Sequence, residues 1–261
     1  MLTLAKSLLP SQLVPSTHFH LSPAESLPFI ADNSIALSTA AQAAHWFSQP
    51  EIWNELARVA IRPGGTVAFW GYTDCMLPEY PRASMVLAKY NQSPQEFWGQ
   101  YWSRPGRTIN EEHLRALQPP NDGRWERVQR WEYEPTFSPK TTASMGILWP
   151  KKVQPEPDAE AVAQSSGIFG KLVKQGDGMM HNRVKLGDVE NYIRTASSVH
   201  SFFEAHPEHK SLRDGGQGDI VDQCFEEMRK AEDWDQHDWK EMFVDIEWGH
   251  AVLCAKRTDK E

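Results

Sequence analysis

Apolar residues in the first third of the chain switch between strand-like and helix-like spacing. The segments 18–21 and 34–40 are extended candidates, and residues 52–59 carry apolar side chains at helical intervals. Pro63 and two glycines end that helix, and the β-forming stretch 66–72 follows. A strand, a helix, a Gly-Gly turn and a second strand are typical of an α/β fold in which the two strands pair in parallel.

The later segments predict mostly helices, with strands near the end. The expected helices cover residues 2–9, 93–102, 110–117, 188–203 and 219–228. Residues 125–133 are expected to be extended. Two strand-like runs, 243–248 and 250–256, meet at Gly249, and this pattern predicts a C-terminal antiparallel hairpin. The stretch 151–185 is rich in polar residues and proline, and we expect a mobile loop or insertion there within a single domain over 1–261.

Composition narrows the class of protein. Of 261 residues, 40% are hydrophobic and 24% are charged, as in globular enzymes and binding proteins. A net charge of −8 argues against a nucleic-acid partner, and the absence of an 18-residue apolar run argues against a membrane span. Three scattered cysteines favour a reducing, cytoplasmic location. Eleven tryptophans suit either a core or an aromatic-lined pocket.

Four motifs in order resemble one known family. They are AESLPF (24–29), TAAQAAHWF (39–47), ARVAIRPGGTVAFWGY (57–72) and YIRTASSVHSF (192–202). Together they resemble class I S-adenosylmethionine-dependent methyltransferases, and most closely the trans-aconitate methyltransferase-like group of fungi. The resemblance implies a Rossmann-like α/β sheet with a helical cap and the C-terminal antiparallel hairpin. It also implies methyl transfer to a small-molecule oxygen, a carboxylate or a hydroxyl, in secondary metabolism.

The chain departs from that family at its beginning. The family fold opens with two strands and a glycine-rich turn that holds the cofactor, whereas the first glycine here is Gly64. We therefore expect an N-terminally truncated sheet that lacks its first two strands and leaves the strand at 34–40 as an edge. A homodimer or a heteromer is expected to cover that edge. The missing turn puts binding of S-adenosylmethionine in question.

Resemblance and position suggest candidate site residues at the strand ends. The cofactor-binding candidates are Ala24, Glu25, Ser26, Gln42 and Trp46, with Ala24–Ser26 along the adenine edge. His45 follows a parallel strand, where open α/β sheets bind ligands, so it is a candidate general base as well as a candidate packed histidine. A hydroxyl acceptor would need this base, and a carboxylate acceptor would not.

Substrate contacts are expected from two further groups. Trp70 and Tyr72 end the second strand of the pair. Trp102 and Arg107 lie in YWSRPGR, and Tyr192 and Arg194 lie on the late helix that caps the pocket in the family. An arginine can clamp a substrate carboxylate through two hydrogen bonds, although surface ion pairs and core packing are equally consistent with these residue types.

Two alternatives and one exclusion complete the interpretation. His181, His200, His206 and His209 do not share a helix face, so we expect no metal site. A methyltransferase-like pocket without the glycine turn also fits a cofactor-free cyclase or isomerase. A non-catalytic partner subunit fits the open sheet edge.

Overall fold

The computed structural model describes residues 2–137, 179–235 and 238–261. The strands are β1 (Leu37–Ala41), β2 (Thr66–Met76), β3 (Trp125–Tyr133), β4 (His181–Lys185) and β5 (Phe243–Arg257). They form one sheet in the order β1-β2-β5-β3, with β4 also paired to β5. Only β1 and β2 run in parallel, with Leu37 opposite Thr66, and the pairs made by β5 are all antiparallel.

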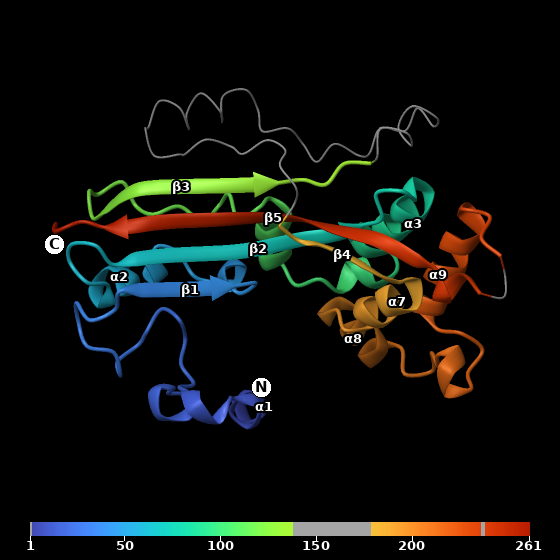
Figure 1. Ribbon diagram of the computed structural model, residues 1–261, viewed down its shortest axis with the longest axis horizontal. Coiled ribbons are helices and arrows are strands. Elements are labelled where there is room, and N and C mark those ends of the chain that lie inside the picture. Colours follow the sequence, from blue (N-terminus) through green and yellow to red (C-terminus); the bar gives the residue numbers. More distant parts are fainter. Residues whose placement is uncertain (1, 138–178, 236–237) are drawn as a thin grey trace.

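The helices are α1 (Leu2–Leu8), α2 (Glu51–Val59), α3 (Pro81–Gln92), α4 (Gly106–Glu111), α7 (Leu186–Arg194), α8 (Ser197–Ala205) and α9 (Ile220–Ala231). In Figure 1, α2 lies at one end of the sheet, α3, α7, α8 and α9 gather at the other, and α1 lies apart from the strands. Short 3₁₀ helices are η1 (Ser11–Ser16), η2 (Ala44–Trp46), η3 (Trp98–Tyr101), η4 (Leu212–Asp214) and η5 (Trp239–Glu241). None of the helices in the described ranges has both the length and the apolar content that a membrane crossing requires.

Two apolar clusters hold the helices to the sheet. In the first, Trp53 of α2 packs against Phe69 of β2 and Trp125 of β3, with ring centroids 5.4 Å apart in both pairs. In the second, α3, α7, α8 and α9 cover the far end of β2 and the start of β5, around Leu77, Phe225 and Ile246. Alternation along β2 sends Val67 and Phe69 into the first cluster and leaves Trp70 and Tyr72 half-buried on the other face.

The sequence predicted this fold class correctly, including the parallel pair β1–β2 and the extended segment that became β3. The strand β1 lies at the edge of the sheet in the described part of the chain, as expected. The Asp219 side chain caps α9 by accepting hydrogen bonds from the backbone N–H groups of Val221 and Asp222. The end of β1 therefore lies beside Trp70 and Tyr72 as expected, but the predicted end of the second strand at Tyr72 is wrong, because β2 continues to Met76.

The predicted C-terminal hairpin is wrong, because β5 continues straight through Gly249. A Cβ atom at Gly249 would lie 2.4 Å from Thr73 Oγ1, so glycine serves close strand packing there rather than a turn. The register between β2 and β5 shifts at this point, between Tyr72 and Cys75. Because β2, β3 and β4 are all antiparallel to β5, the single reversed strand of the described sheet is β5.

Three other expectations need correction. Residues 18–21 form no strand, and His20 stacks on Phe29 with ring centroids 3.9 Å apart. The aromatic helix expected at 93–102 is reduced to η3, because the chain folds back so tightly that a Cβ at Gly99 would lie 2.4 Å from Ser93 O. The expected loop 151–185 lies outside the described residues up to 178, and its last five residues are β4.

Candidate functional site

The end of β1, which lies beside Trp70 within β2, positions the candidate site. Gln42, directly after β1, donates from its backbone N–H to Trp70 O (2.8 Å). Its side-chain amide continues the ladder, since Oε1 accepts from Tyr72 N at 2.7 Å and Nε2 donates to Tyr72 O at 3.1 Å. The Gln42 amide therefore fixes the end of β1 to β2 at Tyr72, and both of its polar atoms already have protein partners.

His45 is buried in η2, the turn that follows β1. Its Nδ1 atom has no hydrogen-bond partner among the described residues. Burial lowers the pKa of the imidazole below its ordinary value of 6.5. The ring is therefore neutral at neutral pH, and an unpaired nitrogen remains as a proton acceptor. This is the protonation state that a general base needs.

A second unpaired polar atom lies at the same end of the sheet. Asn110 of α4 donates from Nδ2 to Tyr72 O at 2.8 Å, but its buried Oδ1 has no partner in the described ranges. Two of the four such buried atoms, from His45 and Asn110, therefore belong to elements that pack on the ends of β1 and β2. Buried polar atoms are normally hydrogen-bonded, so unpaired ones indicate a site that takes a ligand or water.

Trp46 provides an exposed aromatic surface beside His45. Its side chain is 55% exposed, and it is the sole tryptophan among the exposed large hydrophobic residues of the described ranges. The indole lies directly over Gly106, where a Cβ would come within 2.6 Å of Trp46 Cζ3. Glycine at the start of α4 thus lets the ring lie flat against the helix. An exposed tryptophan of this kind suits stacking with a planar ligand group.

The Ala24–Ser26 segment lies beside the same turn. Glu25 accepts a hydrogen bond from Ser48 N (2.7 Å), two residues after Trp46, and Ala24 packs on the cluster under α2. Ser26 donates from its backbone N–H to Pro23 O and accepts at its carbonyl from the Ser22 hydroxyl. The segment therefore lies next to η2, and its contact with a cofactor stays a prediction.

The predicted substrate contacts Trp70 and Tyr72 lie within β2 as part of an aromatic wall, and their contact with a substrate stays a prediction. The rings of Trp70 and Tyr72 have centroids 6.2 Å apart. Tyr192 of α7 accepts a hydrogen bond from Trp248 Nε1 at 3.0 Å. The pKa of Tyr192 is raised mainly by burial, with a contribution from its hydrogen bond to Tyr72. Tyr72, Tyr192 and Trp248 therefore meet, and Trp248 is a member of this wall that sequence reasoning missed.

Arg107 has a role different from the predicted substrate clamp. The guanidinium is buried and binds Asp74 with two hydrogen bonds of 2.9 and 2.8 Å, while Nε donates to Glu111 at 2.6 Å. Burial alone would lower the pKa of Arg107, but the charges of Asp74 and Glu111 and the hydrogen bonds to them together outweigh burial, and the pKa is raised. The arginine is committed to internal partners, so it is not available to a substrate carboxylate here.

Trp102 belongs to the same network. The Arg107 guanidinium lies 4.6 Å from the centre of the Trp102 ring, and the indole Nε1 donates to Asn91 Oδ1 at 3.1 Å. Asn91 in turn donates to Asp74 at 2.5 Å. We refer to Asp74, Asn91, Trp102, Arg107 and Glu111 as the Asp74 network. Sequence reasoning missed Asp74, although it shares the polar side of β2 with Trp70 and Tyr72.

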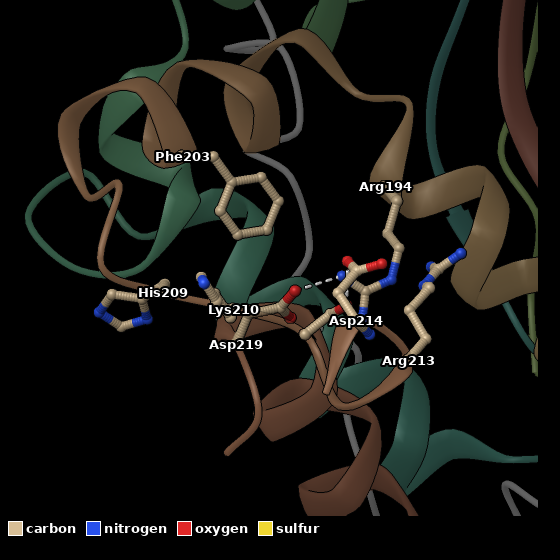
Figure 2. Close-up of a pocket in the computed structure, with 8 residues that line it drawn as sticks. Arg194, Phe203, His209, Lys210, Arg213, Asp214 and Asp219 are labelled. Atoms are coloured by element: carbon tan, nitrogen blue, oxygen red, sulfur yellow. Dashed lines mark hydrogen bonds and ion pairs between the residues drawn. The ribbon is translucent and has the colours of Figure 1, made fainter. Parts of the chain in front are cut away.

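Arg194 lies away from the strand ends. It binds Asp219 (2.5 Å), Asp222 (2.8 Å) and Glu190 (2.9 Å), so its donors are also used inside the protein. Figure 2 shows it at one side of an open cavity of about 450 Å³. Phe203, His209, Lys210, Ser211, Arg213, Asp214 and Asp219 complete the lining. The predicted substrate contact of Arg194 with the strand-end site is therefore corrected to an ion-pair role under α9.

The described residues fit S-adenosylmethionine only in part. Trp46 offers a stacking surface, and His45 and Asn110 offer unpaired polar atoms. However, no glycine-rich turn follows a strand in the described ranges, since the first glycine is Gly64. The amide of Gln42, a predicted cofactor ligand, is bonded to Tyr72. The site therefore offers more contacts for the nucleoside part of the cofactor than for its methionine part.

Comparison with known proteins points to methyltransferases. No family model matches the chain. A Saccharomyces cerevisiae protein named "Probable S-adenosylmethionine-dependent methyltransferase CRG1" is 28% identical over 132 residues, which are 49% of this chain and 45% of the relative. A "Putative methyltransferase" of Dictyostelium discoideum is 29% identical over 99 residues, 38% of this chain and 36% of the relative. The matched region thus spans less than half the length of these curated relatives.

A solved structure gives the same answer for the fold. The "Putative Type II Methyltransferase" from Anaeromyxobacter dehalogenans superposes with a TM-score of 0.52 at 18% identity, covering 96% of this chain and 79% of that one. At this identity the likeness concerns the fold alone. The family resemblance drawn from the sequence is therefore confirmed: the chain is similar in sequence to S-adenosylmethionine-dependent methyltransferases and has a methyltransferase-like fold.

Proposed function

We propose that this chain acts in S-adenosylmethionine-dependent methyl transfer to an oxygen of a small molecule, at the end of β1 beside Trp70 and Tyr72 of β2. His45 carries the proposal, since it is buried, its pKa is lowered, and its Nδ1 is unpaired within the described ranges. In this site His45 accepts the proton of a hydroxyl acceptor. Trp70, Tyr72 and Tyr192 form the wall against which the acceptor packs.

S-Adenosylmethionine would supply the methyl group, and the protein contributes position. A methyl transfer needs an in-line approach of the acceptor oxygen, so alignment provides most of the rate. The two hydrogen bonds between the Gln42 amide and the Tyr72 backbone fix the end of β1 relative to β2. The Asp74 network fixes the segment before α4, and α4 carries Asn110 and supports Trp46.

Titration of S-adenosylhomocysteine into the full chain tests cofactor binding. We expect saturable binding that the Trp46→Ala substitution weakens by roughly tenfold or more, because one base-stacking contact contributes about 1–3 kcal/mol. Phe243→Ala removes another exposed aromatic ring (54% exposed) at the start of β5 and serves as the control. A folded chain that binds no cofactor product, by calorimetry and circular dichroism, would contradict the proposal and favour the cofactor-free cyclase or isomerase.

A test of the reaction follows from binding. The methyl-labelled cofactor is incubated with a panel of small carboxylic acids and a panel of phenols. Labelled product from either panel supports an oxygen acceptor. Label in neither panel, from a chain that binds the cofactor product, would contradict the proposed acceptor class while leaving cofactor binding intact.

The edge of β1 favours a second candidate function, that of a partner subunit. In the described part of the chain β1 has a neighbour on one side only, and Leu37 at its start is 58% exposed. Leu13, Val14 and Leu21 are also exposed in the segment before β1. Unpaired strand edges pair readily with other chains. We propose that a second copy covers this edge, and we expect light scattering to report a dimer that Leu37→Lys converts to monomer.

A further inference from the structure

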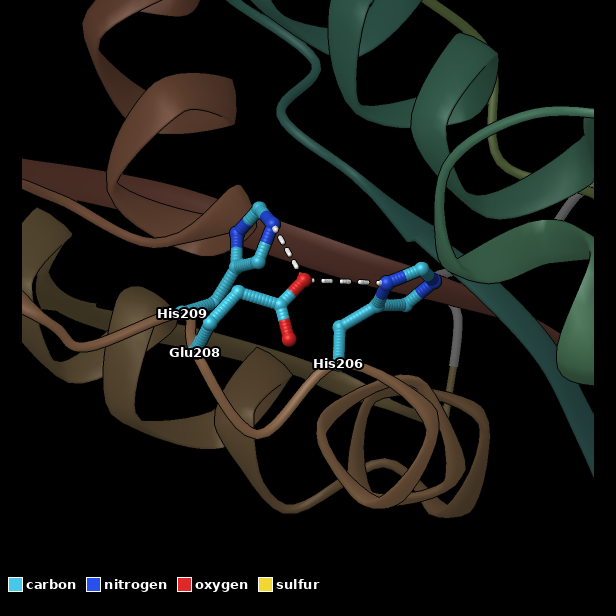
Figure 3. Close-up of side chains that lie close together, drawn as sticks. All are labelled: His206, Glu208 and His209. Carbon is cyan, nitrogen blue, oxygen red and sulfur yellow. Dashed lines mark ion pairs between the residues drawn. The ribbon is translucent and has the colours of Figure 1, made fainter.

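A turn after α8 brings together three metal-ligand side chains far from the strand ends. His206 follows the last residue of α8, and His209 N donates to His206 O at 3.1 Å, which closes the turn. The Nδ1 atom of His206 lies 3.4 Å from Glu208 Oε1, and His209 Nε2 lies 3.8 Å from the same oxygen. Figure 3 shows this carboxylate oxygen between the two imidazole rings. All three ligand atoms lie within 4.8 Å of one another.

These distances suit a shared metal ion better than hydrogen bonds. An N–H···O hydrogen bond measures about 2.7–3.2 Å, so the 3.4 and 3.8 Å separations are too long for good ones. Tetrahedral Zn²⁺ binds nitrogen and oxygen at about 2.0–2.2 Å, which separates neighbouring ligand atoms by about 3.3–3.6 Å. The two separations from the Glu208 oxygen are therefore close to those of such a site, and the two histidine nitrogens lie within 4.8 Å of each other.

Neighbouring side chains hold the two rings in place. The Nε2 atom of His206 lies 2.8 Å from the hydroxyl of Tyr101, on the side of the ring opposite Glu208. A ligand histidine normally has such a hydrogen bond on its second nitrogen, because the bond fixes ring orientation and tautomer. The Phe202 ring packs against both imidazoles, with centroids 4.5 Å from His206 and 5.4 Å from His209. The two imidazole rings would therefore need little rearrangement to bind an ion.

The donor set and its exposure point to the type of ion. Two imidazole nitrogens and one carboxylate oxygen suit Zn²⁺, whereas Ca²⁺ and Mg²⁺ favour oxygen ligands alone. The side chains of His206, Glu208 and His209 are 37%, 67% and 29% exposed. A water molecule can therefore reach the fourth position. Glu208 and His209 also line a second open cavity, with Lys210 and Gly216–Gly218.

We propose that His206 Nδ1, the Glu208 carboxylate and His209 Nε2 form a Zn²⁺ site that ties the turn after α8 to Tyr101 of η3. The sequence alone gave the opposite expectation, because four histidines without a common helix face indicate no site. The turn at 206–209 brings two of these histidines close to Glu208 without a shared helix face. Of the other two histidines, His181 lies on β4 and His200 pairs with Glu204 along α8 at 3.4 Å.

The test is a calorimetric titration of ZnCl₂ into the untagged, chelator-stripped full chain. We expect one saturable site per chain. Glu208→Gln and His209→Gln should each weaken Zn²⁺ binding by at least about 10–100-fold, the range already seen when only an outer-shell partner is lost. Tyr101→Phe should weaken it by roughly tenfold, since Tyr101 positions the His206 ring without touching the ion.

His200→Gln is the matched control, because it removes an exposed histidine paired with a glutamate but with no third ligand in the described part of the chain. It should leave Zn²⁺ affinity unchanged. Circular dichroism confirms that each variant is folded. Co²⁺ should also bind and give the visible absorption of a tetrahedral site. Absence of saturable Zn²⁺ binding, or equal binding by wild type, Glu208→Gln and His209→Gln, would overturn the proposal.

Discussion

Replacing His45 with glutamine is expected to lower the rate of methyl transfer to a phenol by about 10²–10⁴-fold, the usual contribution of a general base. Glutamine approximates the size and polarity of the imidazole but cannot accept the proton. Binding of S-adenosylhomocysteine should be retained, because the proton is taken from the acceptor. The measurement is the single-turnover rate with methyl-labelled cofactor, for wild type and variant.

The pH dependence provides an independent check on His45. Burial lowers the pKa of the folded-state imidazole below 6.5, so the ring stays neutral at pH 7 and gains a proton only as the pH falls through that lowered value. The wild-type rate should therefore hold through neutral pH and fall on the acid side, below the ordinary histidine range. The His45→Gln variant should lack this acid limb.

A second buried histidine gives the control. His113 is also buried, but its Nε2 lies 3.3 Å from Tyr133 O and 3.1 Å from Glu134, so it has partners inside the protein. His113→Gln should affect stability more than rate. A rate unchanged by His45→Gln would mean that His45 is a packed residue and that it does not take the proton of the phenol.

Replacing Asp74 with alanine is expected to lower the free energy of unfolding by about 3–5 kcal/mol, the range for removing one partner of a buried ion pair. The side chains of Arg107 and Asp74 are only 4% and 14% exposed. The substitution leaves the guanidinium buried, with the Glu111 carboxylate 2.6 Å from its Nε atom. It also removes the acceptor for Asn91 and Gln92. Urea unfolding followed by circular dichroism measures the loss.

The matched control is Asp245→Ala, which breaks an exposed pair on another strand. Asp245 of β5 lies 3.1 Å from Arg183, and the two side chains are 41% and 63% exposed. Exposed pairs contribute about 0–1 kcal/mol, so this variant should unfold nearly like wild type. If Asp74→Ala were no more destabilising than Asp245→Ala, the Asp74 network would not hold the site, and Arg107 would again be a candidate substrate clamp.

Short-range sequence patterns predicted an element correctly where the side that carries its apolar residues is also the side buried in the fold. The spacing of Ile52, Trp53 and Leu56 gives α2 because their common side faces the sheet, where all three are buried. Gly249 misled because glycine is read as a turn from sequence, whereas here it allows β5 to pass close to Thr73. Glycine is needed at this position because β2, a strand distant in sequence, packs closely against it. A local sequence pattern carries no information about that contact.

In the candidate site too, features set by the local sequence could be predicted, and those set by distant residues could not. The position of His45 after a parallel strand could be predicted, because the ends of such strands form the ligand side of an α/β sheet. The roles of Arg107 and Arg194 could not, because an arginine binds whichever carboxylate the fold brings near. Asp74, Asp219 and Asp222 approach these arginines only after folding. His206 and His209 became neighbours through the turn that joins them, and the Phe202 ring packs against both.

The continuous strand β5 also determines how the protein can be made. It pairs with β2, β3 and β4, and all three precede it in the chain. While a ribosome is still producing the residues before Phe243, those strands have no central partner and present open edges. Such edges invite pairing with other nascent chains. We therefore expect ribosome-bound intermediates that stop before β5 to recruit chaperones, and we expect release from them to coincide with the arrival of this strand.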